Sequence, residues 1–234
     1  EPAKPPDAEI AELHGTAPGM AQLRHRLMIC AADRAPLFMF GETGTGKERA
    51  ARAVHRLSKR GPWMPVNCGA ESEGLGAEAF LGHDAGAYTG AVRGRVGYFA
   101  AADGGTLFLD EVTELSPKLQ PVLLRLLAEG EVTPLGRNGT LRPQGRVDVR
   151  VICASNRDLA AEVTAGRFRE DLYWRLCHLR VELPPLRERR EDILSLLLHS
   201  VPEREFPRSV QICEAILCHS FPGNIRTLQA IAAE

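Results

Sequence analysis

The sequence lacks long hydrophobic runs. Its apolar stretches, such as residues 37–40 and 196–198, are far shorter than the roughly 18 residues that a membrane-spanning helix needs. We therefore expect no transmembrane segment, no signal peptide and no membrane partner.

Glycine and proline are too scarce for a fibrous or low-complexity chain, because the 234 residues include only 22 glycines and 16 prolines. Hydrophobic residues make up 44% and charged residues 25%, which is typical of a globular protein with a sizeable core. The patterns G-x-S-x-G, H-E-x-x-H and G-x-G-x-x-G are also missing. Their absence disfavours serine hydrolases, zinc proteases and dinucleotide-dependent enzymes.

The six cysteines include no C-x-x-C pair, so we expect neither a disulfide framework nor a zinc site. Most lie in apolar stretches, which indicates buried, reduced thiols in a cytoplasmic protein. The net charge of -1, from 29 basic and 30 acidic residues, is too small to draw the whole chain onto nucleic acid. The chain begins at Glu1 and breaks off within a helical pattern, so we interpret it as part of a longer protein. Contact with DNA is expected only from a domain outside this chain.

Short apolar runs alternate with helical patterns along most of the chain. Residues 1–9 are rich in proline and charge and predict a linker. From residue 10 to residue 183, strands predicted at 37–40, 64–68, 106–109 and 147–153 alternate with helical patterns. This alternation predicts an α/β fold with a mostly parallel sheet flanked by helices. From residue 184 to residue 234 only helical patterns remain, at 191–198, 210–219 and 225–233, which predicts a small all-helical lid subdomain.

One helix has clear start and stop signals. Ser116 is its predicted N-cap, Pro117 its first helical residue, and Gly130 lies just past its end. Its apolar residues recur at intervals of three and four, which indicates one core-facing stripe.

A glycine-rich segment follows the first predicted strand. Residues 41–48 read GETGTGKE and fit the pattern G-x-x-x-x-G-K between a strand and a helix. Glycines let successive backbone N–H groups point at phosphate oxygens, while the helix N-terminus and a lysine add positive charge. The segment therefore predicts a binding loop for a nucleoside triphosphate, formed by Gly41, Glu42, Thr43, Gly44, Thr45, Gly46, Lys47 and Glu48.

Two carboxylates end the apolar strand at 106–109. Asp110 and Glu111 emerge at the carboxyl end of a predicted parallel strand, where such sheets bind ligands. We expect Asp110 to hold Mg²⁺ and Glu111 to polarise the attacking water. Glu48 stands where the general pattern has a serine or threonine on the metal, and its carboxylate suits Mg²⁺ as well.

These residues resemble the AAA+ ATPase domain of bacterial enhancer-binding proteins, which are transcriptional activators that act on sigma-54 RNA polymerase. The resemblance covers roughly residues 12 to 234, and a glutamate at position 48 is typical of that family's loop. The most diagnostic segment is similar to the family's GAFTGA loop and comprises Gly86, Ala87, Tyr88, Thr89, Gly90 and Ala91. In the family this loop touches sigma-54, which implies the sigma-54 RNA polymerase holoenzyme as partner.

The resemblance also implies roles for five polar residues. Asn67 matches the asparagine that holds the catalytic glutamate, Asn156 looks like sensor I, and Arg226 looks like sensor II. Arg169 and Arg175 resemble arginine fingers, which reach the nucleotide of a neighbouring subunit. Fingers that act between subunits require a ring, expected to be a hexamer, with ATP and Mg²⁺ as cofactors.

Other interpretations of the same residues stay open. The two arginines could form surface ion pairs with Glu170 or Asp171, and Asn156 could be a helix N-cap. Departures from the family pattern at positions 88, 155 and 221 suggest an alternative function, a nucleotide-gated assembly or binding module with little hydrolysis. A second alternative is an AAA+ remodeller of a different target.

Overall fold

The computed structural model describes residue 10 and residues 13–69, 76–83, 94–130, 146–200 and 209–232. The predicted linker at 1–9 and the segment at 86–91 lie outside the described residues. The chain divides into two compact units. The sheet unit comprises Arg34–Phe38 and Lys59–Arg180, and the loop unit comprises Glu1–Asp33, Met39–Ser58 and Val181–Glu234. The subdomain boundary expected at residue 183 stays a prediction.

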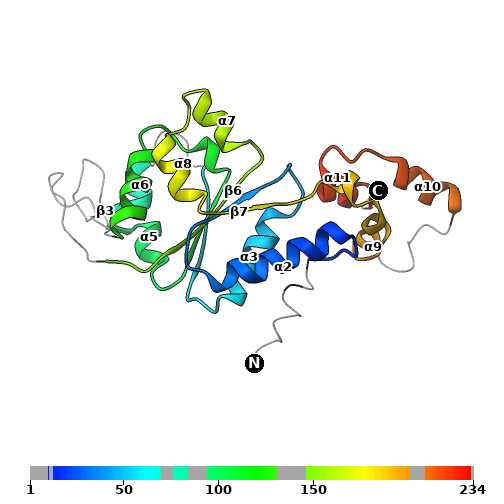
Figure 1. Ribbon diagram of the computed structural model, residues 1–234, viewed down its shortest axis with the longest axis horizontal. Helices are drawn as coiled ribbons and strands as arrows, with labels where there is room; N and C mark the ends of the chain where they lie inside the picture. The colour runs from blue at the N-terminus through cyan, green and yellow to red at the C-terminus, as the bar shows by residue number, and fades with distance from the viewer. Residues whose placement is uncertain are drawn as a thin grey trace. The chain divides into compact units, whose positions relative to one another are not determined.

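A five-stranded sheet with the order β2-β5-β6-β1-β7 is the centre of the sheet unit (Figure 1). Its strands are β1 (Leu37–Phe40), β2 (Trp63–Asn67), β5 (Thr106–Asp110), β6 (Arg150–Ser155) and β7 (Leu179–Glu182). Strand β5 pairs in parallel with β2 on one side and with β6 on the other. The apolar residues of β5 are buried, as expected for a central parallel strand. The α/β fold with a mostly parallel sheet is confirmed.

Strand register fixes which side chains meet at the carboxyl edge of this sheet. Asn67, the last residue of β2, pairs with Asp110, the last residue of β5. The N–H of Cys68 donates to the carbonyl of Asp110 at 2.9 Å, which extends the pairing by one residue. Strand β6 begins at Arg150 and not at Val147, because Asp148 accepts hydrogen bonds outside the ladder from the Gly104 N–H.

Among the described residues, five α-helices, the 3-10 helix η1 (Val112–Glu114) and a short antiparallel strand pair complete the sheet unit. The helices are α4 (Gly76–Leu81), α5 (Tyr98–Ala101), α6 (Gln120–Glu129), α7 (Leu159–Thr164) and α8 (Glu170–Leu176), and β3 (Gly82–His83) pairs with β4 (Arg95–Val96). The prediction that α6 begins at Pro117 is wrong. The chain from Ser116 first makes a tight turn, with the Leu119 N–H on the Ser116 carbonyl, and the helix begins at Gln120. Its predicted end is confirmed, because Gly130 follows it with φ 64°.

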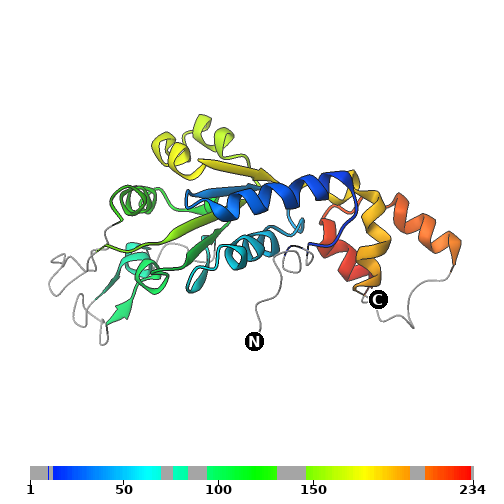
Figure 2. The ribbon, with the colours of Figure 1, turned by 60° about the horizontal axis from the view of Figure 1, so that its bottom comes forward.

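The loop unit contains two helices around the phosphate loop and a helical cluster near the chain's end. The first two are α2 (Pro18–Ala32) and α3 (Lys47–Leu57). After β7 come the short 3-10 helices η3 (Leu186–Glu188) and η4 (Arg190–Asp192), then α9 (Ile193–Leu198), α10 (Val210–Cys218) and α11 (Asn224–Ala232), which gather in Figure 2. Buried Leu186, Leu196, Phe221 and Leu228 form part of their core. We call residues 184–232 the lid.

Two other expectations concern membrane-spanning helices and the burial of the cysteine thiols. In the described part of the chain, no helix combines the length and the apolar character that crossing a membrane requires. The expectation of mostly buried thiols is only partly correct. Cys30, Cys68 and Cys153 are buried, whereas Cys218 is exposed at the end of α10.

Candidate functional site

The phosphate loop connects β1 to α3, as the sequence predicts. Gly44 and Gly46 have φ values of 78° and 101°, a backbone region that glycine adopts without strain. Lys47 is the first residue of α3, and its Nζ donates to the carbonyls of Gly41 at 2.6 Å and Glu42 at 3.0 Å. The loop therefore brings its lysine, its glycines and a helix N-terminus together.

The side chain of Glu42 is held by two residues of the lid. Arg187 makes a bidentate pair with its carboxylate, with N–O distances of 2.7 and 2.8 Å. The amide of Asn224 donates to the same carboxylate at 3.2 Å. Arg187, and after it Asn224, hold the pKa of the Glu42 carboxyl below its ordinary value.

The start of α11 lies against the same loop. The Ile225 N–H donates to the carbonyl of Gly44 at 3.0 Å. The predicted sensor residue Arg226 is exposed, and its Cβ lies 3.2 Å from the position that a Cβ on Gly44 would take. Arg226 therefore stands beside the loop within the loop unit, and its role stays a prediction.

A small pocket adjoins the loop in the same unit. Thr45 and Gly46 form one side of it, and the apolar side chains of Leu13, Leu23 and Ile225 form much of the rest. Its volume is only about 20 Å³, and Arg49 and Arg189 also line it.

Glu48 follows Lys47 in the first turn of α3 and is exposed. Its carboxylate accepts hydrogen bonds from Nε and Nη2 of Arg52, one turn later, at 3.1 and 2.8 Å. Glu48 therefore takes part in an exposed i,i+4 ion pair, and its predicted contact with Mg²⁺ is untested.

In the sheet unit, the carboxylates after β5 lie beside the end of β2. Asp110 Oδ1 accepts the N–H of Glu111 at 3.0 Å, and Glu111 has a φ of 51°. A glutamate in this left-handed region stores backbone strain, which occurs most often at functional sites. Glu111 Oε2 and Asn67 Oδ1 lie 3.2 and 3.3 Å from the position of a Cβ on Gly69. The predicted pair of Asn67 and Glu111 is thus brought to one place.

Asn156 follows β6 directly and is exposed at the same carboxyl edge. Before it, the buried Ser155 hydroxyl lies 3.1 Å from the Thr113 hydroxyl and accepts the Arg157 N–H at 2.9 Å. The N-cap of α7 is Asp158, whose side chain accepts the Ala160 N–H. The interpretation of Asn156 as a helix N-cap is therefore wrong, while its sensor role stays a prediction.

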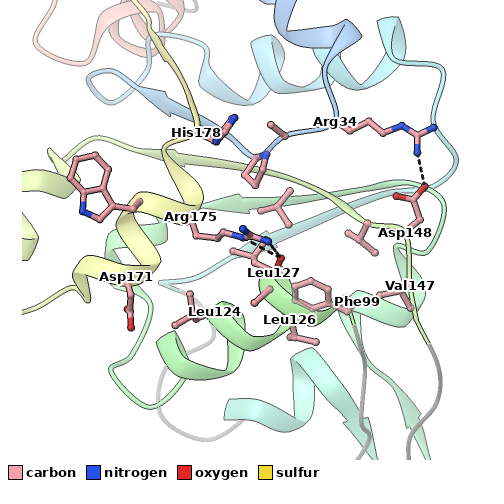
Figure 3. A pocket seen from close by; sticks show the side chains of 17 residues that line it. Arg34, Phe99, Leu124, Leu126, Leu127, Val147, Asp148, Asp171, Arg175 and His178 are labelled. Atoms are coloured by element: carbon pink, nitrogen blue, oxygen red, sulfur yellow. Dashed lines mark hydrogen bonds and ion pairs between the residues drawn. The ribbon is translucent and has the colours of Figure 1, made fainter.

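The two predicted finger arginines have different partners. Arg169 precedes α8 and makes a bidentate pair with Asp171 at 2.7 and 3.0 Å, which is the surface ion pair that the residues alone left open. Arg175 reaches from α8 to the Leu127 carbonyl near the end of α6, at 2.9 and 3.3 Å (Figure 3). It lines a pocket of about 690 Å³ together with the exposed Trp174. Both arginines are exposed to solvent.

The predicted residues thus fall into two groups. Those of residues 41–48 and Arg226 lie in the loop unit, whereas Asn67, Asp110, Glu111, Asn156 and both finger arginines lie in the sheet unit. The sequence reasoning missed Arg187 and Asn224 as partners of Glu42. The sequence marks these two residues only by their position. Arg187 comes two residues after Pro184-Pro185, and Asn224 directly follows Pro222-Gly223.

Known proteins resemble this chain over most of its length. Transcriptional regulatory protein ZraR of Salmonella typhimurium is 43% identical over 238 residues, which cover 97% of this chain and 53% of that protein. Response regulator protein PilR of Pseudomonas aeruginosa is 42% identical over 239 residues, with 96% and 52% covered. The chain therefore spans about half the length of these curated relatives.

Among solved structures, NtrX from Brucella abortus in complex with ATP superposes with a TM-score of 0.82 at 30% sequence identity. That match covers 97% of this chain and 54% of the other. NtrX in complex with ADP gives a TM-score of 0.83 at 30% identity, with 97% and 51% covered. Residues 13–182 match the family described as the Sigma-54 interaction domain. The chain therefore belongs to the sigma-54 interaction domain family, the AAA+ domain of bacterial enhancer-binding proteins.

Proposed function

We propose that this domain hydrolyses ATP with Mg²⁺ and uses the energy to remodel the sigma-54 RNA polymerase holoenzyme. The observation that carries the proposal is the cluster of Asp110, Glu111 and Asn67 at the edge of the sheet. A module that only bound nucleotide would need the phosphate loop but not a strained glutamate beside an asparagine.

The residues of the loop unit fit a triphosphate. Positive φ values at Gly44 and Gly46 support a tight loop, and α3 is an 11-residue helix whose N-terminus follows it. Lys47 would add its charge to the phosphates, and Arg226 would approach them from the lid. The base would contact Leu13, Leu23 and Ile225 only after the pocket of about 20 Å³ that they line has widened.

The residues of the sheet unit suit the hydrolytic step. Asp110 would hold Mg²⁺, which supplies positive charge to the phosphates, and Glu48 of the loop unit is the other ligand that we propose. Glu111 would accept a proton from the attacking water, and Asn67 would hold the Glu111 carboxylate in position.

We further propose that Arg169 and Arg175 act on the nucleotide of a neighbouring copy in a ring, expected to be a hexamer. To do so, Arg175 would leave the Leu127 carbonyl and Arg169 would leave Asp171. Both exchanges need only side-chain rotation, because both arginines are exposed. The segment 86–91 would contact sigma-54 through Tyr88. Binding to DNA would be supplied by a domain outside this chain, and the setting would be the cytoplasm.

The first test measures the ATPase rate per subunit against protein concentration for the unmodified chain and for Glu111→Gln. We expect a rate that rises with concentration, and a loss of about a hundredfold or more in the variant with retained ATP binding. ATP binding with no turnover at any concentration would instead favour the assembly module.

The second test measures binding to sigma-54 in the presence of a transition-state analogue. We expect Tyr88→Phe to bind sigma-54 and Tyr88→Ala not to bind it. If both variants hydrolyse ATP at equal rates but neither binds sigma-54, a different target is favoured.

A further inference from the structure

Every backbone carbonyl of the phosphate loop from Gly41 to Thr45 accepts a hydrogen bond. The first two receive theirs from the loop and α3. Lys47 Nζ donates to both carbonyls, and the Thr45 hydroxyl adds a bond of 2.8 Å to the carbonyl of Glu42.

The next three carbonyls receive their bonds from the lid. Asn224 Nδ2 donates to Thr43 at 3.0 Å, the Ile225 N–H donates to Gly44 at 3.0 Å, and Arg189 Nη2 donates to Thr45 at 3.2 Å. The last of these donors is only 3% exposed, so its bond is shielded from water. Three consecutive peptide groups of the loop are thus fixed by residues more than 140 positions away in the chain.

Hydrogen bonds to these carbonyls also fix the direction of the N–H groups that follow them. In a trans peptide the N–H of one residue points opposite to the carbonyl of the residue before it, and the described chain contains no cis peptide. Donors on the carbonyls of Thr43 and Thr45 therefore set the N–H groups of Gly44 and Gly46 to point away from those donors. These are the groups that a phosphate-binding loop must present.

The carboxylate of Glu42 is unexpected in a loop that binds polyphosphate, because its negative charge repels the ligand. Its partners Arg187 and Asn224 both belong to the lid, and Asn224 also donates to the Thr43 carbonyl. Asn224 is itself fixed, because it is 1% exposed and its Oδ1 accepts the Leu186 N–H at 2.7 Å. The carboxylate therefore ties the loop to the residue that orients its backbone.

We propose that Glu42, Arg187, Arg189 and Asn224 are positioning residues for polyphosphate, which orient the loop's N–H groups from the lid without touching the ligand. The inference rests on the proposed function, because it names what makes the ATP site competent. It gives the lid a role in phosphate affinity that is separate from any contact of Arg226 with the nucleotide.

Glu42→Gln tests the proposal through the sign of its effect. Removing a negative charge that merely lay near the ligand would tighten binding. If the carboxylate positions the loop, its loss weakens binding by about tenfold, as expected for one charge-assisted hydrogen bond. We would measure the affinity for MgATP and for inorganic tripolyphosphate by calorimetry, with Glu191→Gln as a control that makes the same charge change at an exposed lid position.

Variants at two further positions separate positioning from general damage. Asn224→Asp keeps the acceptor for Leu186 and suits the φ of 53°, but it removes the amide donor, so we expect a loss larger than that of Glu42→Gln. Arg187→Gln changes an exposed side chain and is not expected to unfold the chain; its matched control is Arg190→Gln. Arg187→Lys should recover part of the affinity, since one donor of the pair remains.

The outcomes are distinct. Weaker binding of both probes by the three variants, with unchanged controls and a cooperative melting transition of each variant without nucleotide, supports the inference. Equal or tighter binding by Glu42→Gln and Arg187→Gln overturns it while leaving the proposed function standing. If the unmodified chain binds neither MgATP nor tripolyphosphate, the proposed function fails and the inference fails with it.

Discussion

Replacing Gly44 with alanine should separate the start of α11 from the phosphate loop. Gly44 has a φ of 78°, and a Cβ built on it lies 2.1 Å from the carbonyl oxygen of Gly223. That atom belongs to the backbone just before α11, so it cannot move aside by a side-chain rotation. The turn at Gly223 must shift, and the bond from the Ile225 N–H to the Gly44 carbonyl is the nearest contact to be lost.

The expected magnitude has two parts. An alanine in the left-handed region costs about 1–2 kcal/mol relative to glycine. Losing the Ile225 bond adds about 1 kcal/mol. Gly166→Ala is the matched control, because Gly166 has a φ of 71° but no atom within 4 Å of its built Cβ, so only the first part applies.

Hydrogen exchange measures both effects locally. We expect Gly44→Ala to lower the opening free energy of α11 by about 2–3 kcal/mol, against about 1–2 kcal/mol for the segment around Gly166 in the control. The affinity for MgATP should fall only in Gly44→Ala. Exchange of α11 that is no faster in Gly44→Ala than in the unmodified chain, or an equal loss of stability in the two variants, would contradict this expectation.

Three further predictions concern other parts of the chain. Arg175→Ala should lower the ATPase rate per subunit at ring-forming concentrations about a thousandfold and leave MgATP affinity unchanged in a calorimetric titration; an unchanged rate would remove it from the neighbour's site. The pKa of the Glu42 carboxyl is lowered in the folded chain, so the ionised carboxylate stabilises the fold relative to Glu42→Gln. This stabilisation should be constant at neutral pH and disappear as the pH falls below the carboxyl's ordinary pKa of 4.5. Melting temperatures of both chains across that range test this, and an advantage of Glu42 that persists in acid would contradict it. Asp158→Ala should destabilise the start of α7 by about 1 kcal/mol through loss of its bond to the Ala160 N–H, as denaturation measurements would detect; no change would mean that the cap contributes nothing.

Local patterns account for what the sequence predicted well. The phosphate loop is a strand, a turn and a helix that follow one another directly, so glycine spacing and one lysine identify it. The strand that ends in Asp110 was equally easy to predict, because a buried parallel strand is a continuous apolar run. The start of α6 was misplaced since Ser116 and Pro117 suit a tight turn as well as a helix start.

The parts that escaped prediction depend on contacts between distant residues. Arg187 and Asn224 meet Glu42 across 145 and 182 positions of chain, and no spacing rule connects them. Likewise, the sequence could not choose between partners for Arg175, which bonds a backbone carbonyl 48 positions earlier. Backbone carbonyls carry no residue identity, so a pattern of side chains cannot reveal them as acceptors.

The left-handed backbone at Glu111 has a consequence for how this domain could change over generations. Glycine or asparagine would occupy the same φ of 51° with less strain, and would stabilise the strand end. Selection for thermal tolerance alone would therefore favour discarding the very carboxylate that we assign to water activation. A heat-resistant variant library grown without demand for the proposed ATP hydrolysis should accumulate such replacements at this position, whereas a library held to that demand should keep the glutamate and gain its stability elsewhere.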